Sequence, residues 1–122
     1  MPDYVILHHQ LPGGSDRRSH WDVMFQVNDI LLTWAVDEAP RPGLRAAARL
    51  LEDHRLEYLD YSGPVSANRG EVVPWDRGTY QGDPSKANCF SLQLQGRQFE
   101  GLVQLEPVEE KEGQWWITFP EE

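Results

Sequence analysis

The chain has 122 residues, of which 39% are hydrophobic and 25% charged; this is the size and composition of one soluble domain with a single core, and it excludes a two-domain enzyme. The net charge of −9 at pH 7 argues against a general nucleic-acid-binding protein, because affinity for the phosphate backbone comes largely from lysine and arginine. No apolar run approaches the about 20 residues that span a bilayer, and the first residues lack the features of a signal peptide, so we expect a cytoplasmic protein without a membrane segment.

Turn-forming residues recur at short intervals along the chain, and short apolar stretches lie between them. This spacing predicts an all-β sandwich or barrel rather than alternating β and α units. Residues 44–51 contain strong helix formers and are the one credible helix by propensity, and residues 75–78 (WDRG) are interpreted as a turn with an aromatic anchor. In chain order, strands are expected at 4–9, 20–27, 30–36, 72–75, 90–94, 102–107 and 115–119.

The clearest element is the segment 20–27, in which apolar and polar residues alternate with a period of two. A two-residue turn and a return strand at 30–36 complete a hairpin. With this loop length, Asp22 lies across from Ala35. His20 and Asp22, two residues apart on a strand, then point to the same face.

A histidine and a carboxylate on one face are natural ligands for a divalent ion of intermediate hardness, such as Mn, Fe, Co or Zn. Two ligands hold a catalytic ion poorly, so a third is needed. The adjacent pair His8-His9 ends another apolar strand, and only one of the two can face the interior. The alternative interpretation is that these histidines are ordinary surface residues or hydrogen-bonded core residues.

A second group that can carry chemistry is Glu52-Asp53-His54, followed by Tyr58. If this stretch is a helical turn, His54 and Tyr58 lie on one face. A histidine can act as a general acid or bind a phosphate oxygen, and a tyrosine hydroxyl can orient the same group. The alternative is a capping and packing role.

Several short motifs follow one another along the chain: YVILHH at 4–9, HWD at 20–22, LLTWAVDEAP at 31–40, EDHRLEY at 52–58 and WDRG at 75–78. With a glycine-containing loop, LQGRQFEG at 94–101 and the late tryptophans, they resemble the 3′-phosphoesterase domain of bacterial DNA ligase D over nearly the whole chain. The resemblance implies a mainly β fold: a small single-domain β-barrel over residues 1–122, with at most one or two short helices. It also implies a strand in place of the helix at 44–51.

The same resemblance implies a manganese-dependent enzyme, with zinc or cobalt as alternatives, that trims DNA 3′ ends by removing a terminal ribonucleoside and then a 3′-phosphate. The implied metal ligands are His9, His20 and Asp22, which selects the second of the two adjacent histidines. His54 would contact the scissile phosphate, with Tyr58 beside it. The implied partners are a nucleic-acid 3′ end, bound with weak general DNA affinity because of the net charge, and a ligase or polymerase.

Two cationic positions of the family are lost here: the arginine that follows the metal-binding aspartate is Met24, and the lysine of the W-A-V-P-K segment is Glu38. A further family arginine aligns with Ala46; if the register shifts, Arg45 or Arg49 takes its place. The remaining phosphate-binding candidates are Arg17, Arg18, Arg45, Arg49 and Arg69.

One lost oxyanion donor raises the activation free energy by about 3–4 kcal/mol. The loss of these cations therefore leaves three hypotheses. The first is a stand-alone metal-dependent phosphoesterase that acts on 3′ ends. The second is a catalytically weakened or inactive binding or scaffold module of DNA end repair. The third is a metal-dependent enzyme that acts on a small molecule in the same pocket.

Overall fold

A computed structural model describes residues 2–11, 19–65 and 70–121 of the chain. These residues form ten β-strands and one 3₁₀ helix, η1 (Leu56–Leu59), and none of their helices is long and apolar enough to cross a membrane. The expected mainly β fold is confirmed. The strands are β1 (Asp3–Gln10), β2 (His20–Val27), β3 (Ile30–Val36), β4 (Arg45–Leu50), β5 (His54–Arg55), β6 (Gly63–Pro64), β7 (Glu71–Gln81), β8 (Phe90–Gly96), β9 (Glu100–Pro107) and β10 (Gln114–Thr118).

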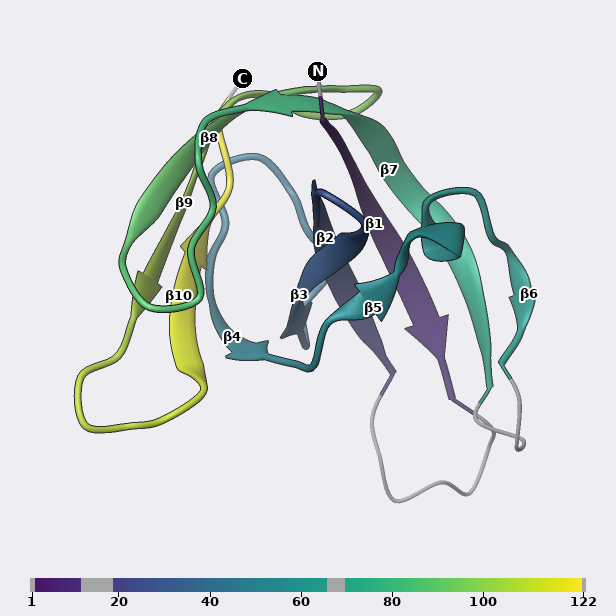
Figure 1. Cartoon of the computed structure of the whole chain (residues 1–122), viewed down its shortest axis with the longest axis horizontal. Helices are drawn as coiled ribbons and strands as arrows, with labels where there is room; N and C mark the ends of the chain where they lie inside the picture. Colours follow the sequence, from purple (N-terminus) through teal and green to yellow (C-terminus); the bar gives the residue numbers. More distant parts are fainter. Residues whose placement is uncertain (1, 12–18, 66–69, 122) are drawn as a thin grey trace.

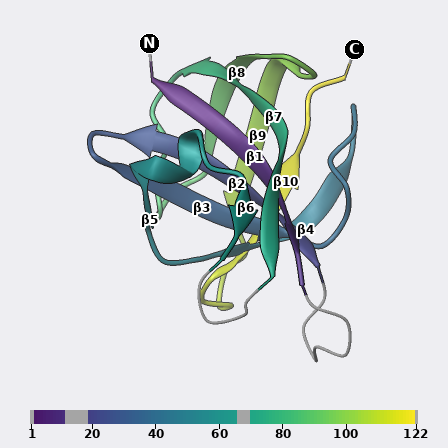
Figure 2. The same ribbon diagram turned by 90° about the vertical axis from the view of Figure 1, so that its right-hand side faces the viewer.

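Eight of these strands close into an antiparallel barrel in the order β1-β2-β3-β4-β10-β9-β8-β7, with β7 paired back to β1. Figures 1 and 2 show the curved sheet from two directions. Of the remaining elements, β5 pairs with β3 and β6 pairs with β7, and η1 lies between them in the chain. We call this segment, residues 54–65, the strap.

The side chains divide into two hydrophobic clusters because successive residues of a strand point to opposite faces. The larger cluster fills the barrel and includes Phe25, Trp34 and Ile117. The smaller cluster lies on the opposite face of β1, β2, β3 and β7, under the strap. Its members are Val5, Leu7, Met24, Leu31 and Val72, against which Leu56, Tyr58, Leu59, Tyr61 and Val65 pack. The strap therefore makes part of the outer barrel face a buried environment.

The β2–β3 hairpin has the predicted register, with Asp22 opposite Ala35. Asn28 in the turn has a φ of 54°. Residues 45–50 form a strand, so the helix expected from propensity is wrong and the resemblance is confirmed at this point. Ala46 and Ala48 point into the barrel and are 5% and 1% exposed; pairing with β3 and β10 and burial of alternate residues outweigh their helix propensity.

The turn expected at residues 75–78 is also wrong, because this motif lies in the middle of β7. Asp76 is 3% exposed and accepts hydrogen bonds from the Tyr4 hydroxyl at 2.6 Å and the Gln98 amide at 2.9 Å. A Cβ at Gly78 would lie 2.1 Å from the carbonyl oxygen of Gln95. Residues that favour turns are used here to bind β7 closely to its neighbours.

Candidate functional site

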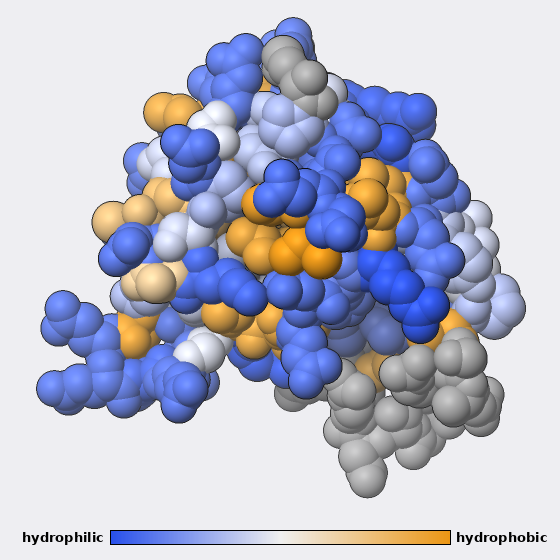
Figure 3. Space-filling model, in the orientation of Figure 1, coloured by the Kyte–Doolittle hydropathy of each residue, from blue (hydrophilic) through white to orange (hydrophobic). Residues whose placement is uncertain are grey.

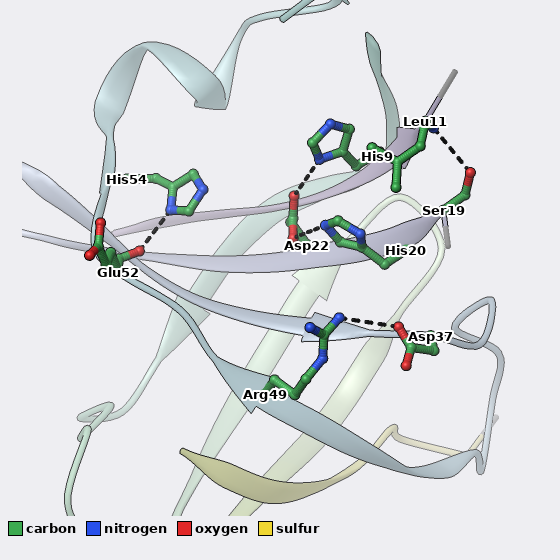
Figure 4. Close-up of polar contacts among 9 residues, drawn as sticks. All are labelled: His9, Leu11, Ser19, His20, Asp22, Asp37, Arg49, Glu52 and His54. Carbon is green, nitrogen blue, oxygen red and sulfur yellow. Dashed lines mark hydrogen bonds and ion pairs between the residues drawn. The ribbon is translucent and has the colours of Figure 1, made fainter. Parts of the chain in front are cut away.

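The three residues expected to bind a metal converge on the face covered by the strap. His9 and His20 are paired across β1 and β2, and Asp22 lies two residues further along β2. The Nε2 atom of His20 is 3.0 Å from Oδ1 of Asp22, and Nδ1 of His9 is 3.7 Å from Oδ2. One ligand atom from each residue lies within 4.8 Å of the others, and Figure 4 shows the three side chains directed at one another.

The neighbouring histidine, His8, points to the opposite face of β1. Its ring stacks on Trp21 with a centroid distance of 4.2 Å and an interplanar angle of 2°, and its edge meets Trp75 at 6.0 Å. The strand alternation that separates His8 from His9 thus brings only His9 to the cluster.

Asp22 is 3% exposed, and burial and the neighbouring imidazoles shift the pKa of its carboxyl in opposite directions. Burial alone raises the pKa of its carboxyl, but the contacts with His20 and His9 outweigh burial and hold the pKa at about 2. The carboxylate is therefore ionised at neutral pH. Among the described residues, its buried Oδ1 has no partner with hydrogen-bond geometry, although His20 Nε2 is close.

This donor set fits a divalent ion. A buried, ionised carboxylate is costly unless positive charge compensates it. Two imidazole nitrogens and one carboxylate oxygen form a set that suits Mn, Fe, Co or Zn and leaves coordination positions for water or substrate. The group of His9, His20 and Asp22 could therefore hold a metal ion.

His54 approaches this cluster from β5, which pairs with β3 at Leu31. Its Nδ1 is 2.8 Å from the carbonyl oxygen of Glu52. Because a carbonyl oxygen only accepts hydrogen bonds, Nδ1 carries a proton, and the other ring nitrogen, Nε2, is the one directed toward the cluster (Figure 4). The ring of Tyr58 lies 5.8 Å from that of His54, beside it as the resemblance implies. The segment is a short strand followed by a 3₁₀ turn, so the single helical turn on which the argument from spacing depended is absent.

Arg49 lies in the same row of the sheet as Asp22, since Asp22 pairs with Ala35 and Ala35 with Arg49. The residue between them, Ala35, has a small side chain, and Figure 4 shows the guanidinium of Arg49 directed toward the cluster. Its Nη2 atom forms an ion pair with Oδ1 of Asp37 at 3.3 Å, and both side chains are about half exposed.

Arg45, on the same face of β4, is directed elsewhere. Its guanidinium carbon lies 4.4 Å above the ring of Trp116, and its Nη2 is 3.7 Å from Glu106 on β9. Of the two arginines of β4, only Arg49 reaches toward the metal ligands. The remaining candidates, Arg17, Arg18 and Arg69, lie outside the described residues.

The two lost cationic positions are not compensated in place. Met24 is 1% exposed and packs in the smaller hydrophobic cluster, among Val5, Leu7 and Leu31. Glu38 is exposed. β2 therefore has no cation beside Asp22, and the described cation that extends toward the site is Arg49 of β4.

Two residues that support the strap and the site carry little signal in the sequence. Arg77 donates hydrogen bonds to the carbonyl of Leu59 and to Asp60, and so ties the end of η1 to β7. Asp37, the partner of Arg49, was also missed. The signal for Arg77 is a lone basic residue inside a motif otherwise made of turn formers.

Comparison with known proteins gives two matches. A family model for the DNA ligase D 3′-phosphoesterase domain matches residues 13–106. The multifunctional non-homologous end joining protein LigD of Pseudomonas aeruginosa is 30% identical over 113 residues, which cover 83% of this chain and 14% of that protein. The chain thus spans 14% of the length of this relative. The family match begins after His9, which only the strand pairing brings to the other two ligands.

Proposed function

The chain belongs to the family of DNA ligase D 3′-phosphoesterase domains, and on this premise we propose that it is a metal-dependent phosphoesterase acting on nucleic-acid 3′ ends that carry a 3′-phosphate or a 3′-ribonucleotide. The observation that supports the proposal best is the convergence of His9, His20 and Asp22 on one buried point, flanked by His54 and Arg49.

In this proposal His9, His20 and Asp22 hold the ion. Manganese is the first choice because the family resemblance implies it, and a set of imidazole and carboxylate donors accepts it. A divalent ion bound there supplies a Lewis acid for a phosphoryl oxygen and lowers the pKa of a coordinated water. Burial of Asp22 keeps water from competing for its oxygens, and its low pKa keeps it ready to coordinate at neutral pH.

Arg49 and His54 act on the phosphate from two sides. Arg49 releases Asp37 and binds phosphate oxygens, for which the planar guanidinium is well shaped. His54, with Nδ1 held by the Glu52 carbonyl, presents Nε2 to the substrate. When protonated it donates a hydrogen bond to the phosphate or a proton to the leaving oxygen, and Tyr58 restrains its ring.

Removal of the terminal ribonucleoside leaves a 3′-phosphate, and removal of that phosphate leaves a 3′-hydroxyl, the end that a polymerase extends and a ligase seals. The relative's name refers to non-homologous end joining. We extend that process to this chain, with a ligase or polymerase as the next enzyme to act on the product.

A second function, a non-catalytic binding module of DNA end repair, is favoured by one observation. Met24 fills the position of the family arginine with a buried apolar side chain, and Arg49, which among the described residues extends toward the ligands, is ion-paired to Asp37. A site of this kind can retain the metal and lose turnover.

One assay separates the two functions. The protein is incubated with Mn²⁺ and primers that end in a 3′-phosphate or a single ribonucleotide, beside the variants His20→Asn and His54→Gln. Turnover that requires metal, disappears in His20→Asn and falls strongly in His54→Gln supports the enzyme. Tight Mn²⁺ binding without turnover on either end supports the module and contradicts the proposed activity.

A further inference from the structure

A groove lies between η1 and β6, beside the proposed site. Its volume is about 390 Å³, within the range of small-molecule pockets and much larger than a phosphate group requires. Figure 3 shows the molecule in the orientation of Figure 1: hydrophilic residues cover most of this face, and hydrophobic residues gather near the centre of the face. The groove is lined by Arg55, Glu57, Tyr58, Tyr61, Pro64 and Val65.

The groove and the proposed site share Tyr58. The Tyr58 ring, 5.8 Å from His54, is also 5.8 Å from the ring of Tyr61 at an interplanar angle of 81°. On the sheet below, His9 pairs directly with Val72 of β7, and Tyr58 and Tyr61 pack against the cluster that contains Val72. The rings of His54, Tyr58 and Tyr61 thus follow one another from the proposed site to the groove.

The lining is aromatic and close to neutral. Arg55 and Glu57 form an ion pair at 3.3 Å, with side chains 84% and 62% exposed, so their charges cancel at the rim. The Tyr61 hydroxyl donates to the carbonyl of Pro64, which fixes the ring before a ligand arrives. A fixed aromatic ring in a neutral groove suits a flat heteroaromatic ring, because bases stack on tyrosine faces without sequence preference.

We propose that this groove binds the base of the 3′-terminal nucleotide, stacked against Tyr61, while its phosphate occupies the site at His54 and Arg49. The inference rests on the proposed function in taking a nucleic-acid 3′ end as the ligand. It adds a reason why an acidic protein recognises a strand end: a stacked base supplies affinity that few cations can supply here. The groove then selects nucleotides over simple phosphate esters.

The first test compares two 3′-phosphorylated oligonucleotides that differ only in the terminal nucleotide, one with a base and one with an abasic tetrahydrofuran residue. Stacking of one base predicts a kcat/KM roughly fivefold to 100-fold higher for the end with a base. Tyr61→Phe keeps this preference because it keeps the ring. Tyr61→Leu keeps the apolar packing but brings the ratio close to one. Equal rates on both ends in the wild-type protein would overturn the inference and leave the proposed activity standing.

A binding measurement without turnover separates the two proposals. An oligonucleotide with 2-aminopurine as its 3′-terminal base loses fluorescence when that base stacks. Quenching by the wild-type protein and by Tyr61→Phe, but not by Tyr61→Leu, supports the groove even if no end is hydrolysed. Quenching that is absent, or that is unchanged in Tyr61→Leu with a wild-type melting temperature, would overturn it.

Discussion

Replacing Arg49 tests the assignment of the phosphate-binding cation, and β4 offers a matched control. Arg49 and Arg45 lie on the same face of one strand, each is ion-paired to one carboxylate, and each is about half exposed. They differ in direction, since Arg49 extends toward the metal ligands and Arg45 lies over Trp116. The variants Arg49→Gln and Arg45→Gln therefore remove the same charge at two distances from the site.

The expected loss follows from one charge-assisted hydrogen bond, which contributes about 1.5–3 kcal/mol. Because the Arg49 side chain is 47% exposed, we expect the lower end of this range, about a tenfold fall in kcat/KM for a 3′-phosphorylated primer. Arg45→Gln should remain within about twofold of wild type. The assay is release of inorganic phosphate in the presence of Mn²⁺, with melting temperature as the control for folding.

An equal or larger loss in Arg45→Gln would refute this reasoning, because it would place the phosphate near Trp116 instead of His54. Wild-type rates in Arg49→Gln would refute it as well, and would shift the phosphate-binding role to an arginine outside the described residues.

Three further predictions follow from particular contacts. Asp37→Asn frees Arg49 from an exposed ion pair worth at most about 1 kcal/mol, so inhibition by inorganic phosphate should strengthen by up to about fivefold. Weaker inhibition would contradict the idea that Asp37 and phosphate compete for Arg49. Burial, and then Asp76, raises the pKa of Tyr4 above its usual 10.0, so the folded state favours the neutral phenol. The stability that this phenol contributes is fully present below pH 10 and falls as the pH rises beyond it. In urea titrations, Tyr4→Phe should flatten that decline and lower the free energy of unfolding at pH 7 by about 1–3 kcal/mol. Arg77→Gln should release η1 from β7, so the strap amides should exchange hydrogen faster while the barrel amides stay unchanged. Equal exchange in the wild-type protein and in Arg77→Gln would mean that hydrophobic packing alone holds the strap.

The elements nearest the site were predictable because their signals are local. Alternation over residues 20–27, with a two-residue turn after it, sets the hairpin register and hence the shared face of His20 and Asp22. The choice between His8 and His9 depends instead on which side of β1 meets the barrel interior. The residues alone leave that choice open, and strand pairing decides it.

Other features were not predictable because they depend on long-range packing. The alanine-rich strand β4 is held by pairing to β3 and β10, which local propensity does not contain. Arg77 and Asp76 make their contacts with residues 17 to 72 positions away, so the motif at 75–78 was misread as a turn. The buried environment of Asp22 depends on the strap, whose cover over the outer barrel face has no signal in residues 20–27.

Manganese binding measured by electron paramagnetic resonance tests the central claim most directly, because free and bound Mn²⁺ give different signals and no substrate is needed. We predict one bound ion per chain in the wild-type protein and in His8→Gln, whose ring stacks on Trp21 away from the cluster, and loss of that ion in His9→Gln and in Asp22→Asn. Retention of the ion in His9→Gln with unchanged affinity, or its loss in His8→Gln alone, would contradict the three-residue metal site on which the proposed activity depends.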